Sequence, residues 1–194
     1  MVAVQPVDID RVHSLVPPCL QIVPIFPGKT LGGVYIASYD SGSTLKYSEL
    51  IVVSALTSYA GKVAPWISHI YVDCADSVQG GREIWGLPKE MAQFSWKKPE
   101  LPSVQVSQGE QFLCACNGRW QTPGVPLPIS GAVFSTLDAT MMAFSSQGRA
   151  ELHWVNADLQ IPPQSPIASL GFGQNWLTFH ATALTLTINA PLSV

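Results

Sequence analysis

The feature that most constrains the fold is a series of short apolar runs, rich in β-branched and aromatic residues, that proline, glycine or polar turns separate. Such runs predict β-strands, and the turn residues between them predict a β-dominated chain. The 16 prolines and 15 glycines lie mainly between the runs. The predicted strands cover residues 31–39, 47–58, 69–74, 94–98, 104–108, 111–116, 150–159 and 178–188.

This pattern predicts a mainly β fold, barrel-like or sandwich-like, with few short helices. One helix is expected over residues 7–16, where apolar residues have helical spacing, Asp8 is the expected N-cap, and two prolines follow. No internal repeat, low-complexity tract or linker divides the chain. Residues 1–194 are therefore interpreted as a single domain, large enough to enclose a cavity.

Charge is scarce, since only 12 % of the 194 residues are charged, 47 % are hydrophobic, and the net charge is −3. A disordered chain needs high charge, and a nucleic-acid-binding domain usually carries a basic stripe, so both classes are excluded. The longest apolar stretch, residues 50–67, is interrupted by polar residues and a proline, which argues against a membrane-spanning helix. So few charges leave little polar surface for a monomer, which predicts a homo-oligomer.

The cysteines Cys19, Cys74, Cys114 and Cys116 are too few and too irregularly spaced for a disulfide framework. We interpret them as buried small hydrophobic side chains of a cytoplasmic protein, because the first residues also show no secretory signal. The single-residue spacer between Cys114 and Cys116 is not that of a zinc knuckle, and the four histidines are scattered. No metal or other cofactor is expected.

The most informative segment is residues 80–92, GGREIWGLPKEMA, in which one lysine follows an apolar, aromatic stretch directly after a proline. Pro88 fixes its own φ and favours an extended Leu87, so the backbone presents Lys89 rigidly. An extended backbone here points Lys89 and Glu90 to opposite sides. In an apolar cavity desolvation disfavours the ammonium form, and a neutral amine can attack a ketone to form a Schiff base. The alternative is a surface lysine in a turn, since lysines are rarely buried.

Residues 81–89, GREIWGLPK, resemble the signature of the acetoacetate decarboxylase family, in which Gly-Arg-Glu and a short spacer lead to Pro-Lys. The resemblance implies that Lys89 is the Schiff-base lysine and that the fold is the mainly β fold of that family. The Tyr-Ser-Glu element ending at Glu49 is similar to a family element whose glutamate lines the active site. Weaker similarities near both ends extend the resemblance over about residues 7–192.

The sequence departs from the family pattern at two points. In the acetoacetate decarboxylases proper a second lysine follows the nucleophile, whereas Glu90 stands at that position here. The family's active-site arginine lies upstream of the matching part, so no residue of this sequence is assigned to that role. The chain is therefore identified as a short, divergent member, and its substrate is left open.

Several residues near the lysine or the glutamate are further candidates for the site. Glu49 is interpreted as an acid–base or lysine-orienting group, with a charge at a strand edge as the alternative. Arg82 and Glu83 are interpreted as a structural ion pair beside the site. The candidate substrate-binding or supporting residues, some lining an apolar cavity and some flanking the lysine, are Tyr47, Arg82, Glu83, Trp85 and Met91.

The preferred functional hypothesis is a carbon–carbon lyase. Lys89 attacks the ketone of a β-keto acid or related oxo acid, and the imine accepts the electron pair released when CO₂ departs. A close variant is an imine aldolase or dehydratase that does not decarboxylate. A different class is a non-catalytic barrel that binds an apolar metabolite such as an isoprenoid or a pigment, and Lys89 in bulk solvent would favour it. The expected partners are these small molecules.

Overall fold

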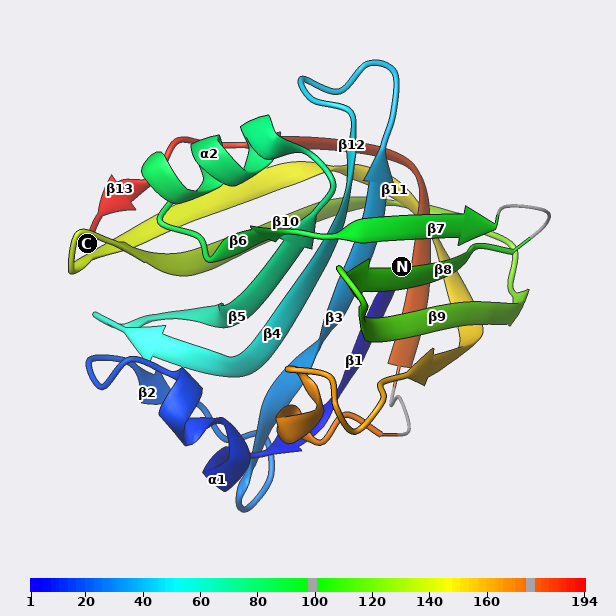
Figure 1. Ribbon diagram of the computed structural model, residues 1–194. Helices are drawn as coiled ribbons and strands as arrows, with labels where there is room; N and C mark the ends of the chain where they lie inside the picture. The colour runs from blue at the N-terminus through cyan, green and yellow to red at the C-terminus, as the bar shows by residue number, and fades with distance from the viewer. Residues whose placement is uncertain (98–100, 174–176) are drawn as a thin grey trace.

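The computed structural model describes residues 1–97, 101–173 and 177–194, and most of them lie in β-strands (Figure 1). Residue 98, the last of one predicted strand, lies outside this part. The helical segments are α1 (Ile9–Val12), α2 (Ala75–Glu83) and two 3₁₀ turns, His13–Leu15 and Ala168–Leu170. The strands are β1 (Val2–Asp8), β2 (Gln21–Ile22), β3 (Lys29–Tyr39), β4 (Tyr47–Tyr59), β5 (Lys62–Val72), β6 (Lys89–Met91), β7 (Gln93–Lys97), β8 (Ser103–Gln108), β9 (Gln111–Gln121), β10 (Val125–Leu137), β11 (Thr140–Gln160), β12 (Leu177–Ile188) and β13 (Leu192–Ser193).

This content confirms the predicted mainly β class, but the strands form one large curled sheet and not a clean barrel. Within the described residues the strand order is β10-β5-β4-β3-β1-β12-β11-β9-β8-β7, and β10 also pairs with β11. The contact that closes the curl, between β5 and β10, is a single register pair, Trp66 with Phe134. Further along β5, its edge at Ile70–Val72 pairs with β6.

The two faces of the β3–β5 part of the sheet are covered differently. One face packs against the part of the sheet formed by β7–β9, and this larger core includes Ile36, Leu50, Val52, Val104, Val106 and Leu113. The opposite face carries a smaller cluster of Ile67, Ile70 and Val72, against which Val78 of α2 and Leu87 pack. Each fully buried aliphatic side chain contributes about 1.5–3 kcal/mol.

Strand register brings the candidate lysine and glutamate to the same face. Lys89 is the register partner of Ile70, Ile70 of Ile51, and Ile51 of Tyr35, across four neighbouring strands. Residues directly opposite in register share a face, and so do residues two apart in one strand. Glu49, two residues before Ile51, therefore lies on the face that carries Lys89.

Helix α2 is not among the predicted elements, because it contains two adjacent glycines and few apolar residues. It lies over the β10–β11 hairpin in Figure 1, and Trp85, just after it, packs edge-on against Phe144 with ring centroids 5.0 Å apart. Gly86 has a φ of +59°, and a Cβ there would meet the carbonyl oxygen of Thr136. Glycine thus permits the close crossing that fixes this segment on β10.

The amino-terminal helix is shorter than expected, because residues 2–8 pair with β3 as strand β1 and the helix begins at Ile9. Asp8 stands at the N-cap without a side-chain cap bond, and its carboxylate binds Lys29 at 2.6 Å instead. β10 and the first half of β11 are further strands that the sequence did not predict. β10 contains Pro126 and Pro128, which are unusual inside strands.

The cysteines follow the prediction only in part. Cys114 and Cys116 are buried in the larger core as expected, but Cys74 is only half-buried. Cys19 is exposed, because it follows the two prolines in a surface turn. No helix in the described part of the chain is long and apolar enough to span a membrane.

Candidate active site

The backbone around the candidate lysine is extended. β6 runs parallel to β5, with Lys89 buried at 7 % exposure and Glu90 exposed. Glu90 turns away from the amine and accepts a hydrogen bond from Gln108 Nε2 at 2.8 Å. The prediction that the two side chains point to opposite sides is confirmed, and the interpretation of Lys89 as a surface lysine is wrong.

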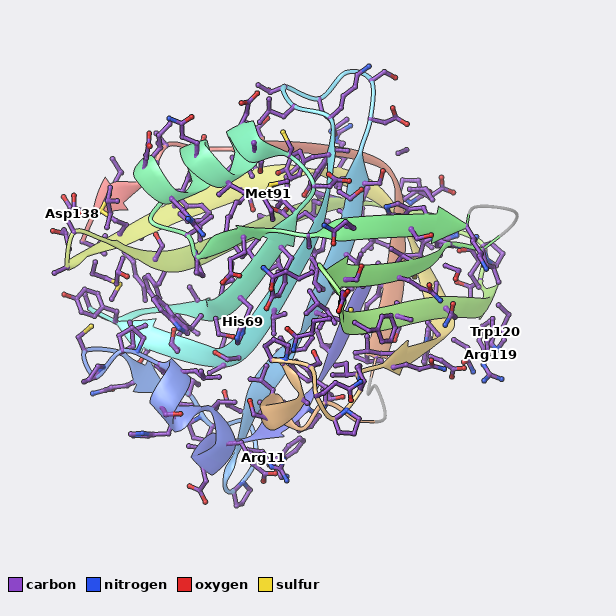
Figure 2. The ribbon with its side chains drawn as sticks, viewed as in Figure 1. Arg11, His69, Met91, Arg119, Trp120 and Asp138 are labelled. Atoms are coloured by element: carbon purple, nitrogen blue, oxygen red, sulfur yellow. The ribbon has the colours of Figure 1, made fainter. Side chains whose placement is uncertain are left out.

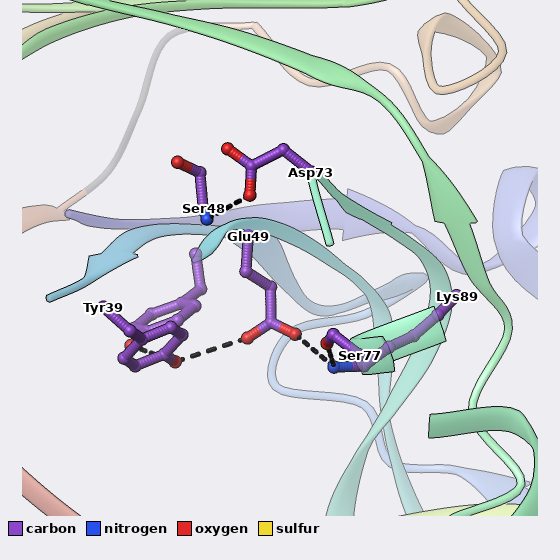
Figure 3. A network of polar contacts seen from close by, with 7 residues as sticks. Tyr39, Ser48, Glu49, Asp73, Ser77 and Lys89 are labelled. Carbon is purple, nitrogen blue, oxygen red and sulfur yellow. Dashed lines mark hydrogen bonds and ion pairs between the residues drawn. The ribbon is translucent and has the colours of Figure 1, made fainter. Parts of the chain in front are cut away.

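The amine of Lys89 lies between a carboxylate and a hydroxyl (Figure 3). Its Nζ is 2.8 Å from Glu49 Oε1 and donates a second bond to Ser77 Oγ at 2.9 Å. Glu49, on β4, is only 4 % exposed. The Tyr47 ring completes this environment, with its centroid 5.2 Å from Nζ. The lysine and the glutamate therefore form a buried ion pair.

Two tyrosines extend the polar contacts away from the lysine. The hydroxyl of Tyr39 donates to Glu49 Oε2 at 3.3 Å, and the hydroxyls of Tyr35 and Tyr39 are 3.0 Å apart. Burial raises the pKa of Tyr39 far above its usual value, and the negative charge of Glu49 raises it further. Burial likewise raises the pKa of Tyr35 and of Tyr47. These phenols stay protonated near neutral pH, so Tyr39 can donate to the carboxylate.

Helix α2 fits closely against the lysine side chain. Ser77 and Gly81 lie one helical turn apart, and a Cβ at Gly81 would be 2.9 Å from Lys89 Cε. Only glycine leaves room for the aliphatic part of the lysine at this point. Arg82 Nε also donates to the carbonyl oxygen of Lys89 at 2.7 Å. The helix therefore holds both the backbone and the side chain of Lys89.

The remaining candidate site residues lie less close to the amine of Lys89. Arg82 does not pair with Glu83 as expected, because its Nε bonds the Lys89 carbonyl while Glu83 accepts from Gln79 at 3.3 Å. Trp85 packs on Phe144, away from the amine contacts. Met91, labelled in Figure 2, is 45 % exposed, so it does not line an enclosed site as expected.

Sequence reasoning missed Ser77, Tyr35 and Tyr39. Tyr35 and Tyr39 are four residues apart in a predicted strand, so they share a face, and this spacing is a signal that could have found them. Ser77 belongs to the unpredicted helix and carried no such signal. Among the described residues, no group of three or more histidine, cysteine or acidic side chains could hold a metal ion.

A cavity of about 440 Å³ lies at the tyrosine end of this network. Tyr35 and Tyr39 line it, together with Trp96 from β7 and His180 from β12. Burial lowers the pKa of His180 to about 4, so its imidazole is neutral near pH 7. The Tyr39 hydroxyl therefore connects this cavity with Glu49, and through Glu49 with the amine.

A family model described as acetoacetate decarboxylase (ADC) matches residues 1–123 of this chain. Among curated proteins, Protein NEOXANTHIN-DEFICIENT 1 of Solanum lycopersicum is 31% identical over 107 residues, which cover 55% of this chain and 36% of the relative. The protein of the same name from Oryza sativa subsp. japonica is 34% identical over 102 residues, covering 52% of this chain and 33% of the relative. The chain thus spans about a third of the length of these relatives.

Solved structures with the same fold cover nearly the whole chain. An acetoacetate decarboxylase from Legionella pneumophila has a TM-score of 0.73 and 19% identity, covering 100% of this chain and 83% of that one. The enduracididine biosynthesis enzyme MppR complexed with pyruvate has a TM-score of 0.65 and 13% identity. The match covers 99% of this chain and 86% of that one. At these identities the likeness concerns the fold.

Proposed function

The chain belongs to the acetoacetate decarboxylase family, and on that premise we propose that it is an enzyme whose Lys89 forms an imine with a small oxo acid. The observation that carries the proposal is the buried contact between Lys89 Nζ and Glu49 Oε1 at 2.8 Å. A protein that only bound apolar ligands would have no need to bury an amine and a carboxylate, because burying charge is unfavourable. A nucleophilic amine needs a nearby group to take its proton, and Glu49 is in place to do so.

The reaction begins with transfer of a proton from Lys89 to Glu49, which leaves a neutral amine. Its nitrogen forms a bond to the ketone carbon, and the ketone oxygen takes a proton from Glu49. Loss of water gives a protonated imine. When a β-keto acid is bound, the bond to its carboxylate breaks, the electron pair moves into the imine to give an enamine, and CO₂ leaves. Protonation of the enamine carbon and addition of water release the ketone and restore the amine.

The contacts around the amine assign distinct roles to its neighbours. Ser77 Oγ accepts a hydrogen bond from Lys89 Nζ, and so orients the nitrogen toward the face that carries Glu49. Tyr39 donates to the other oxygen of that carboxylate and holds it in place when it gains or loses a proton. Among the described residues, Glu49 and Ser77 are the polar partners of Lys89 Nζ, and no second cation contacts it.

Proton NMR in D₂O tests this proposal with acetoacetate and with pyruvate. An enzyme that forms the imine exchanges the hydrogens next to the ketone for deuterium. Lys89→Met should lower the rate of this exchange to the rate in buffer without enzyme. Lys62→Met, which removes an exposed lysine, keeps the wild-type rate. Formation of acetone and CO₂ identifies a decarboxylase, whereas exchange without CO₂ identifies the aldolase or dehydratase variant. Buffer-rate exchange with every oxo acid tried would contradict the proposal and leave the non-catalytic binding function.

We also propose that the protein assembles as a homo-oligomer, because one end of the sheet is open. Strand register places five apolar side chains on one face of the outer parts of β10 and β12. We call them the apolar stripe; four of them are exposed and one is half-buried, and they are Val125, Leu127, Ile129, Leu186 and Ile188. A contiguous apolar surface of this kind marks an interaction site.

A further inference from the structure

We propose that a cleft between β5 and β10 is a second binding site, for a small carboxylate that carries an apolar tail. The cleft encloses about 340 Å³, at the place where the β5–β10 pairing is limited to Trp66 and Phe134. This volume lies at the small end of the range for ligand sites. Neither Lys89, Glu49 nor Ser77 lines the cleft, so the proposal does not depend on imine formation.

The cleft carries a cation without a counter-ion. Arg82, an exposed residue, lines it, and among the described residues its guanidinium donates one hydrogen bond, from Nε to the carbonyl oxygen of Lys89. In the part of the chain that the structure describes, no carboxylate lies within ion-pair distance of Arg82, since Glu83 bonds Gln79 instead. The two terminal NH₂ groups remain available, and they match the two oxygens of a carboxylate.

The cleft also contains a buried hydroxyl that lacks a partner. Ser135 lines the cleft and is only 2 % exposed, yet its Oγ makes no hydrogen bond in the described structure. Buried polar groups nearly always have a partner, because an unmet hydrogen bond in the interior is costly. A bound anion would accept this O–H and recover the missing bond.

The other residues that line the cleft determine which kind of ligand tail it can bind. The lining combines six apolar residues with Ser68 and Thr136, and none of the described residues that line the cleft is acidic. A second carboxylate on the ligand would lose its hydration here without another cation to pair with, whereas a short alkyl chain would bury its surface favourably. The apolar lining residues are Leu15, Trp66, Ile67, Leu87, Pro88 and Phe134.

Isothermal titration calorimetry with sodium hexanoate tests the proposal, because hexanoate has no ketone and cannot form an imine. We expect saturable 1:1 binding, and much weaker binding of the neutral analogue hexanol. Arg82→Gln should weaken hexanoate binding about tenfold or more, since hydrogen bonds to charged groups are strong. Arg149→Gln removes an exposed arginine outside the cleft and should leave the affinity unchanged.

Ser135→Ala separates a binding role from a structural one. The variant removes an unsatisfied buried hydroxyl, so we expect an equal or higher melting temperature together with hexanoate binding weakened about threefold to tenfold. Lys89→Met should retain hexanoate binding. Loss of binding in Lys89→Met would place the ligand at the amine and overturn the proposal. Absence of saturable binding, or unchanged affinity in both Arg82→Gln and Ser135→Ala, would overturn it as well.

Discussion

At the residue scale, the site is organised around the contact between Lys89 and Glu49. Both side chains are more than nine-tenths buried, so neither charge is compensated by water, and each depends on the other. Removing one partner of such a pair leaves an uncompensated charge, whereas removing both leaves none. This dependence distinguishes the pair from the exposed pair of Lys29 and Asp8.

A double-mutant cycle measures that dependence. We expect Lys89→Met and Glu49→Gln each to lower the free energy of unfolding by about 3 kcal/mol, and the double variant to lose clearly less than the sum. Lys29→Met, the exposed control, should cost no more than about 1 kcal/mol. Urea unfolding monitored by circular dichroism provides all four values. Additive losses for the buried pair would show that the two groups are not coupled.

The tyrosines predict a loss of stability at alkaline pH. Burial raises the pKa of Tyr39 and Tyr35 in the folded chain, while tyrosines of the unfolded chain titrate near pH ~10. As the pH rises above that value, the unfolded chain loses protons that the folded chain keeps, so the free energy of unfolding falls. Tyr39→Phe should make this fall less steep, as urea midpoints between about pH 8 and 11 would show. An identical slope in the variant would contradict the assignment.

The sequence predicted part of this site at the residue scale. Lys89 stands directly after Pro88 in a short motif, and Glu49 is an isolated charge in an apolar run, so both stood out. Tyr39 and Ser77 come from segments that carry no motif of their own. Only the pairing of β3 with β4 and the docking of α2 bring them to the lysine.

At the element scale, helix α2 and strand β6 act together to place the amine. The helix packs Gly81 against the lysine side chain and bonds the lysine backbone through Arg82. The sequence predicted the extended backbone of Lys89 because proline restricts its neighbours. It did not predict the helix, since Gly80 and Gly81 disfavour helices locally and tertiary contacts override that preference.

The two adjacent glycines of α2 offer a matched test. Gly81→Ala would place a Cβ 2.9 Å from Lys89 Cε and displace the amine, whereas nothing lies within 4 Å of a Cβ at Gly80. We expect Gly81→Ala to slow imine formation with pyruvate by about 10–100-fold, because small misplacements of a reacting group are costly. Gly80→Ala should keep the rate and raise stability by about 0.5–1 kcal/mol. Equal rates for the two variants, measured by borohydride trapping, would contradict this role of Gly81.

At the scale of the whole molecule, the curled sheet leaves one end uncovered. The alternating apolar runs of the sequence predicted the β class. They did not predict the length of the β10–β11 hairpin, because its prolines and polar residues are typical of loops. This hairpin carries part of the apolar stripe, which is the observation behind the proposed homo-oligomer. The partial closure between β5 and β10 also depends on distant pairing that local sequence patterns do not encode.

The apolar stripe predicts the effect of a charge on assembly. Leu186→Lys places a charge on the stripe and should lower the mass measured by sedimentation velocity toward that of a monomer. Thr187→Lys, at the next position of β12, places the same charge on the opposite face and should leave the mass unchanged. A wild-type protein that sediments as a monomer at all concentrations would contradict the proposed homo-oligomer.

The most direct test of the central claim is borohydride reduction in the presence of pyruvate or acetoacetate, followed by mass spectrometry of the peptides. Reduction converts an imine into a stable secondary amine, so the modified lysine can be located. We predict one adduct, on Lys89, that is absent in Lys89→Met and retained in Lys62→Met. An unmodified Lys89 with every oxo acid tested, in protein shown to be folded, would contradict the claim that this buried amine performs the chemistry.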